Sequence, residues 1–226
     1  MSKSDITPVL FSFPQQAKVG RVVPKSKIYE HGKVNSTLRE KFIGQVEQIS
    51  WAYKLAPETI NLPARGGVVE VQIFDITLKT VELDEEVLRA IDRAIALPII
   101  FQLHHEQHTR MVASFKCPGE AETSKWLIDE YFAGSWLPAE SERQPLPVAL
   151  DLYGLYEQLL RSLLPQPARS GESLPLQLER LNRLRSLCRD YEKLDVRLHR
   201  EKQFNRKVAL NAQLREIRNE IAKLSA

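Results

Sequence analysis

The stretch VVEVQIFDITL at residues 68–78 decides the fold of this 226-residue chain. It is rich in β-branched and aromatic residues, and a Gly-Gly pair at 66–67 is typical of a tight turn before a strand. Val71 and Ile76 are five residues apart, so a regular strand would place them on opposite faces. We therefore predict a strand that either bulges near Asp75 or is buried on both sides.

A helix and a second strand follow this first strand. Asp84 is a good N-cap for a helix, and Pro98 comes after its last apolar residue. The apolar face of this helix consists of Val87, Leu88, Ile91 and Ile95. Residues 99–103 are a continuous apolar run with one glutamine, which is typical of a buried strand. The β-α-β order predicts two parallel strands joined by a crossover helix.

The flanking segments extend this unit into a mixed sheet with helices. Residues 110–115 and a segment near Tyr131, Phe132 and Trp136 predict two antiparallel strands. The first thirty residues contain Pro8, Pro14 and Pro24, and we expect extended chain that ends at the turn His31-Gly32. Thr37 and Glu40 have the spacing of a capping box, and the helix they begin would bury Leu38, Phe42, Val46 and Ile49. Residues 50–55 then look extended. The predicted class is α/β.

The C-terminal part is helical. Asp151 begins an amphipathic helix, and the proline- and serine-containing stretch 165–173 predicts a linker. The expected division is an α/β body at 1–164, the linker, and a basic helical tail at 174–226. Two apolar stripes run along the tail, and each repeats at steps of three and four residues. They consist of Leu184, Leu187, Tyr191, Leu194 and Leu198, and of Leu210, Leu214, Ile217, Ile221 and Leu224.

The block 201–207 interrupts these stripes. Twelve positions separate Leu198 from Leu210, which places the two stripes about a third of a turn apart on a continuous helix. A uniform coiled coil does not need this offset. The tail is therefore either a helical hairpin or one long coiled-coil-like helix that contacts two surfaces.

Charge and composition narrow the function classes. From Leu176 onward the chain contains thirteen Lys and Arg and seven Asp and Glu, a net charge of +6. The rest of the chain therefore has a net charge of −3. A basic tail on a mildly acidic body suits a polyanion or an acidic partner surface. Cys117 and Cys188 lack metal-site or disulfide-framework spacing, and no run reaches the roughly 20 apolar residues of a membrane span. We expect a cytoplasmic protein with no metal and no cofactor.

Glu70 and Gln72 are the best candidates for catalysis. They share one strand face, where an acidic and a second polar group could hold Mg²⁺ in a metal-dependent nuclease. Lys54 or Lys79 could supply a cation for the developing charge. The usual preceding aspartate is missing, and a polar sheet edge explains the pair more simply.

Two weaker candidates lie nearby. Trp51 and Tyr53, with Lys54 beside them, could stack on bases in a nucleic-acid-binding module, but their shared face is more typical of a core position. The cluster from His104 to His108 lacks the HExxH spacing of a zinc helix, so a solvated turn between strands is the preferred interpretation.

The block 201–207 is the most distinctive binding candidate. Cations surround an aromatic residue there, which suits nucleic acid or an acidic protein groove. The alternative is a solvated stretch whose aromatic ring tucks under a hairpin. The residues concerned are Lys202, Gln203, Phe204, Asn205, Arg206 and Lys207.

Four segments together resemble a known prokaryotic family, domain of unknown function 4391. They are WAYKLAPETINL (51–62), EVQIF (70–74), VLRAID (87–92) and EKQFNRKV (201–208). The resemblance implies a place in restriction or phage-defence loci, where members tend to be encoded beside helicases and DNA methyltransferases. It supplies no catalytic residues.

These observations favour an accessory or scaffold subunit that is not an enzyme. Its basic helical tail would bind a helicase or methyltransferase partner, DNA, or a second copy of the chain. No membrane partner is expected. The metal-dependent nuclease around Glu70 and Gln72, and the nucleic-acid-binding module, are the alternatives.

Overall fold

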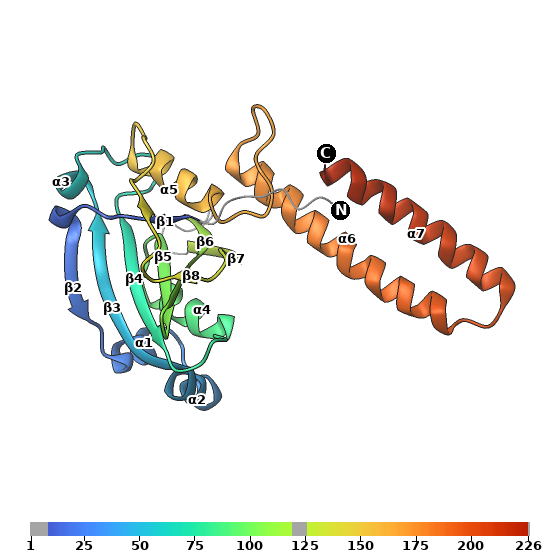
Figure 1. Ribbon diagram of the computed structural model, residues 1–226, viewed down its shortest axis with the longest axis horizontal. Helices are drawn as coiled ribbons and strands as arrows, with labels where there is room; N and C mark the ends of the chain where they lie inside the picture. The colour runs from blue at the N-terminus through green and yellow to red at the C-terminus, as the bar shows by residue number, and fades with distance from the viewer. Residues whose placement is uncertain (1–8, 119–125, 226) are drawn as a thin grey trace. The chain divides into compact units, whose positions relative to one another are not determined.

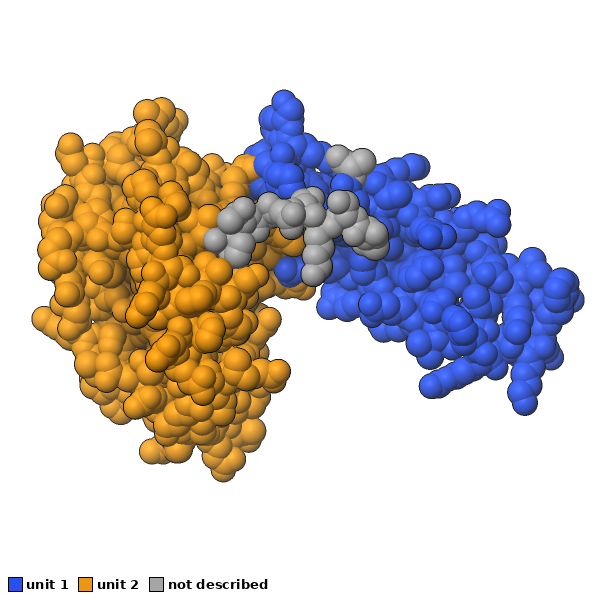
Figure 2. Space-filling model, in the orientation of Figure 1, with its two compact units in different colours: residues 1–4, 166–226 blue, residues 5–165 orange. Residues whose placement is uncertain are grey.

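The computed structural model describes residues 9–118 and 126–225, whose elements are labelled in Figure 1. These residues form two compact units, one reaching to Pro165 and the other beginning at Gln166, coloured separately in Figure 2. The first unit is an α/β unit with a mixed sheet, and the second is a helical hairpin. None of the described helices is long and apolar enough to cross a membrane.

The sheet of the α/β unit has the strand order β2-β3-β4-β5-β6-β7, with β8 beside β6. Within it, only β4 and β5 pair in parallel among the described strands. The strands are β2 (Lys18–Val22), β3 (Val46–Leu55), β4 (Val71–Leu78), β5 (Ile99–His105), β6 (His108–Pro118), β7 (Trp126–Ala133) and β8 (Leu137–Pro138). A parallel pair, β1 (Leu10–Phe11) with β9 (Arg143–Gln144), forms a separate small sheet.

Helices cover both faces of the sheet. On one face, α1 (Lys25–His31), α2 (Ser36–Gln45) and α4 (Glu85–Ala94) pack on β4 and β5 around Phe42, Phe74 and Phe101. On the other, the Tyr156 hydroxyl of α5 (Leu152–Arg161) donates to Ser114 O and accepts from Lys116 N, both at 2.9 Å. Two short helices, η1 (Gln15–Ala17) and α3 (Pro57–Ile60), complete the unit.

The central β-α-β prediction is confirmed. β4 pairs in parallel with β5, and Asp84 caps α4 by accepting from Glu86 N at 3.0 Å. Val71 to Phe74 are all buried, so β4 is covered on both faces, as one of the two predicted alternatives requires. Both glycines at 66–67 have positive φ, which suits the tight turn between Arg65 and Val68.

Two N-terminal predictions are wrong. Residues 25–31 form α1 rather than extended chain, because Pro24 starts the helix and Ile28 anchors it in the core. The next helix is capped by Asn35, two residues before Thr37, and it ends at Gln45. Val46 and Ile49 are therefore buried strand residues of β3 and not part of a helical face.

The helical hairpin consists of α6 (Leu174–Arg200) and α7 (Phe204–Ser225), which run antiparallel in Figure 1. The two apolar stripes line their contact. Leu187, Leu210 and Leu214 are buried, and the remaining stripe residues are half-buried. Of the two predicted arrangements for the tail, the structure shows the hairpin.

Candidate functional site

The turn between α6 and α7 is built by Glu201. Its carboxylate oxygen Oε1 accepts from the backbone N–H groups of Lys202 at 2.8 Å and Gln203 at 2.9 Å. These donors would otherwise lack partners, because α7 starts at the next residue. The bond from Gln203 N is the main reason that the pKa of Glu201 is lowered. Only Glu201, Lys202 and Gln203 lie outside helical structure, and Phe204 to Lys207 already belong to α7.

The end of the hairpin, residues 197–208, presents cations around an apolar spot. We call this surface the hairpin tip. Phe204 is 78% exposed and Val208 is 54% exposed, so the alternative in which Phe204 tucks under the hairpin is wrong. The hairpin tip contains five exposed cations and one carboxylate, that of Glu201, so its net charge is +4. They are Arg197, Arg200, Lys202, Arg206 and Lys207.

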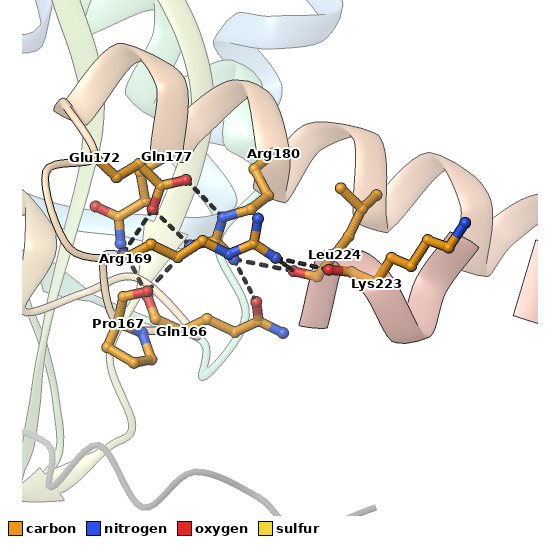
Figure 3. Close-up of polar contacts among 8 residues, drawn as sticks. All are labelled: Gln166, Pro167, Arg169, Glu172, Gln177, Arg180, Lys223 and Leu224. Carbon is orange, nitrogen blue, oxygen red and sulfur yellow. Dashed lines mark hydrogen bonds and ion pairs between the residues drawn. The ribbon is translucent and has the colours of Figure 1, made fainter. Parts of the chain in front are cut away.

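The other end of the hairpin is held by two arginines (Figure 3). The Arg180 guanidinium donates to both carboxylate oxygens of Glu172, at 2.7 and 2.9 Å, and to Leu224 O at 3.2 Å. Arg169 donates to Lys223 O at 2.7 Å and to Leu224 O at 3.1 Å. Both cations therefore cap the carbonyl end of α7, where a positive charge also complements the helix dipole.

This arrangement gives structure to the stretch 165–173. Arg180 also binds Gln166 Oε1 at 2.8 Å and Pro167 O at 3.0 Å, and Gln177 Nε2 donates to Gln166 O at 2.9 Å. The predicted linker is therefore tied to α6 by hydrogen bonds from Gln166 onward.

Three of the four nuclease candidates lie together. The Lys54 ammonium is 2.7 Å from Glu58 Oε1 and 3.2 Å from Glu70 Oε2, and Gln72 donates to Glu70 Oε1. The pKa of Lys54 is raised, mainly by its hydrogen bond with Glu58. Lys79 follows the opposite end of β4, about 20 Å away at strand geometry, and binds Ile43 O instead.

The Glu70 cluster does not bring together a metal-ligand set. Both oxygens of Glu70 already have partners, Lys54 and Gln72. Within residues 9–118 and 126–225, no group of three or more His, Cys, Asp or Glu side chains is placed to hold a metal ion.

Trp51 and Tyr53 do not share a face, which corrects the sequence prediction. Trp51 pairs with Phe74 but Tyr53 pairs with Ile73, so Ala52 is an extra residue in a β-bulge of β3. Trp51 packs against the core beneath the helices, whereas Tyr53 contacts Phe13, with ring centroids 5.1 Å apart. The two rings cannot form one stacking platform.

The histidine cluster is a strand-to-strand turn, as predicted. Glu106 and Gln107 form the turn, and the histidines lie at the ends of β5 and β6. His104 bridges Asp75 Oδ1 at 3.2 Å and Thr109 Oγ1 at 2.9 Å. Asp75 also accepts from Gln102, and this network ties β4, β5 and β6 together.

The family model described as domain of unknown function (DUF4391) matches residues 11–221, which include both units. The chain belongs to this family. No curated protein and no solved structure matches it. In this DUF4391 chain the segment EKQFNRKV, one of the four on which the resemblance was based, coincides with the turn and the first helical turn of the hairpin tip.

Sequence reasoning missed two buried ion pairs of this DUF4391 chain. Arg180 and Glu172 form an ion pair with side chains only 7% and 10% exposed. Lys116 of β6 reaches the end of α4, where its ammonium is 3.3 Å from Asp92 Oδ1. The only available signal was a charge at an otherwise apolar helical or strand position, which does not identify the partner.

Proposed function

We propose that this DUF4391 protein is a non-catalytic accessory subunit of a DNA-directed restriction or phage-defence system in the cytoplasm. Its helical hairpin is the binding element, and the hairpin tip contacts DNA phosphates within an assembly with a helicase or DNA methyltransferase. The observation that carries the proposal is the tip itself, where an exposed Phe204 stands among five exposed cations and one carboxylate.

Physical chemistry supports a polyanion as the tip's ligand. Cations without a matching number of carboxylates bind phosphates through counterion release, and an exposed aromatic ring can stack on a base. Phe204 is 78% exposed, and Val208, four residues further along α7, is 54% exposed on the same helix face. The half-buried stripe residues leave apolar area along the hairpin for a partner's helix or a second copy.

Salt-dependent DNA binding tests the proposal. Fluorescence anisotropy with a labelled DNA duplex should show affinity that falls as the salt concentration rises. The double variant Arg206→Ala, Lys207→Ala should bind the duplex more weakly than the unmodified protein at the same salt concentration. Loss of two phosphate contacts should flatten the slope of log K against log salt by about 1.8. The matched control is Arg215→Ala with Arg218→Ala, which removes two exposed α7 cations outside the tip.

A pull-down with the helicase or methyltransferase encoded nearby tests whether the hairpin binds a protein partner. The tip variant should lose partner or DNA and the control variant should keep both. If the tip variant retains partner and DNA binding unchanged, the hairpin tip is not the binding element.

The nuclease alternative rests on the pairing of Lys54 with Glu70. Plasmid incubated with the protein and Mg²⁺ or Mn²⁺ tests it, with Glu70→Ala as the control. Cleavage that this substitution abolishes would overturn the non-catalytic proposal. A base-stacking module would have to use Trp51 and Tyr53 separately, because their rings lie on opposite faces of β3.

A further inference from the structure

The α/β unit contains a cavity of about 300 Å³ that the proposed function does not use. Its apolar walls come from α1, β3, β4 and the chain after α4, and include Ile28, Trp51, Phe74 and Ile95. Glu70 and Gln72 form its polar end. This volume is at the lower end of the range for small-molecule sites, and a mostly apolar lining with a few polar groups is typical of them.

Glu70 is the one acidic residue among the described residues that line the cavity. Its side chain is 19% exposed, and it shares the Lys54 ammonium with Glu58, which does not line the cavity. Its two oxygens accept from Lys54 and Gln72, and a carboxylate can accept further hydrogen bonds. Lys27 and His31 also line the cavity, and Glu30 lies 3.1 Å and 3.8 Å from them.

The cavity is mostly apolar, and the Glu70 carboxylate that lines it is mostly buried and only partly neutralised. These properties favour one class of ligand. A protonated amine would complete the pairing of Glu70, because hydrogen bonds between charged groups are stronger than those between neutral ones. The indole of Trp51 and the ring of Phe74 provide apolar contact for an aromatic body, and an indole face also attracts cations. A carboxylate ligand would be repelled by Glu70.

We propose that this cavity binds a small molecule with an aromatic or apolar body and a protonated amino group. The body lies against Trp51 and Phe74, and the ammonium binds Glu70. The proposal is independent of the hairpin tip, since all of these residues belong to the α/β unit.

Phenethylamine, 3-phenylpropionate and toluene are suitable probes, because they share a phenyl ring and differ in charge. Titration of the full-length, ¹⁵N-labelled protein should shift the Trp51 indole resonance with phenethylamine and leave it in place with 3-phenylpropionate. Binding of toluene should be at least about tenfold weaker than that of the amine. Absence of amine binding, or equal binding of all three probes, would overturn the proposal.

Glu70→Gln keeps the shape of the side chain and removes its charge, and should weaken phenethylamine binding at least about tenfold. The matched control, Glu58→Gln, removes the exposed carboxylate that also pairs with Lys54 but does not line the cavity, and should weaken binding less than Glu70→Gln does. Equal effects of the two variants would contradict the assignment to Glu70. If Glu70→Gln does not fold, the comparison of probes on the unmodified protein decides the question.

Discussion

Arg180 shows how one side chain can organise a whole end of the hairpin. A guanidinium has five N–H groups, and the five hydrogen bonds of Arg180 reach Glu172, Gln166, Pro167 and Leu224. These partners come from the chain before α6 and from the end of α7. A lysine cannot reproduce this planar set of donors.

Substitution of Arg180 should therefore be far more damaging than that of a surface arginine. Arg180→Ala removes the five hydrogen bonds of its guanidinium and the ion pair with Glu172, whose side chain is only 10% exposed, and we expect a loss of about 3 kcal/mol in the free energy of unfolding. Arg183→Ala is the matched control, because Arg183 pairs with Glu220 at 2.8 Å on the surface and should cost less than about 1 kcal/mol. Urea unfolding followed by circular dichroism measures both. Similar losses would show that the Arg180 network adds nothing to an ordinary surface pair.

Glu172 should make the stability of the hairpin depend on acid pH. Its hydrogen bonds with Arg180 are the main reason that its pKa falls from 4.5 to about 2. A carboxyl group with a lowered folded-state pKa stabilises the fold above its unfolded pKa, and this contribution is lost as the pH falls from about 4.5 to 2. The unfolding midpoint of Glu172→Gln should vary less over this pH range than that of the unmodified protein, and parallel pH profiles would contradict the assignment.

At the scale of the element, α4 depends on a residue that is distant in sequence. The Lys116 ammonium donates hydrogen bonds to Asp92 O at 2.7 Å and to Ile95 O. It therefore caps the carbonyl end of α4. The Tyr131 hydroxyl donates to the other oxygen of Asp92. Burial lowers the pKa of Lys116 and raises that of Asp92, while their mutual attraction opposes both shifts.

Removing one charge of this buried pair should lower the free energy of unfolding more than removing both charges. Lys116→Met leaves Asp92 as an uncompensated buried carboxylate, and we expect a loss of about 3–5 kcal/mol in unfolding free energy. Adding Asp92→Asn should recover part of it, since no buried charge then remains. Thermal or urea unfolding of the single and double variants tests this. A double variant that is less stable than Lys116→Met would show that the charge of Asp92 is not the source of the loss.

Local signals explain which elements the sequence could predict. Asp84, Asp151 and the Gly-Gly pair at 66–67 act within a few residues of themselves, so they predicted α4, α5 and the turn before β4 correctly. The seven-residue α1 offers only Ile28 as a buried residue, too little for a helical period to appear. The bulge at Ala52 has no signature in sequence, and it alone moved Trp51 and Tyr53 to opposite faces.

In the candidate sites, too, contacts set by local sequence were predictable and contacts set by tertiary packing were not. Glu70, Gln72 and Lys54 were predictable together, because strand alternation places the first two on one face and strand pairing brings the third opposite. The hairpin tip was predictable from the interrupted stripes. The buried pairs of Glu172 with Arg180 and Asp92 with Lys116 were not, because their partners depend on tertiary packing.

At the scale of the whole molecule, burial differs sharply between the two units. β4 has six buried residues among its eight, whereas only Leu210 and Leu214 are buried along the 22 residues of α7. Segments with few buried apolar contacts open locally at low free energy. A hairpin with this little burial is suited to gain stability from a partner that covers its exposed apolar side.

Hydrogen exchange should reveal this difference directly. In the isolated protein the amides of α7 should exchange faster than those of β4 and β5, because local opening of the hairpin exposes little apolar surface. Adding duplex DNA or the partner should slow exchange at residues 197–208 first, since they form the hairpin tip. Mass spectrometry of peptides from α7 and from β4 measures both effects in one sample. If α7 is already protected as strongly as β4 in the protein alone, the hairpin does not open at low free energy and does not depend on a partner for its stability.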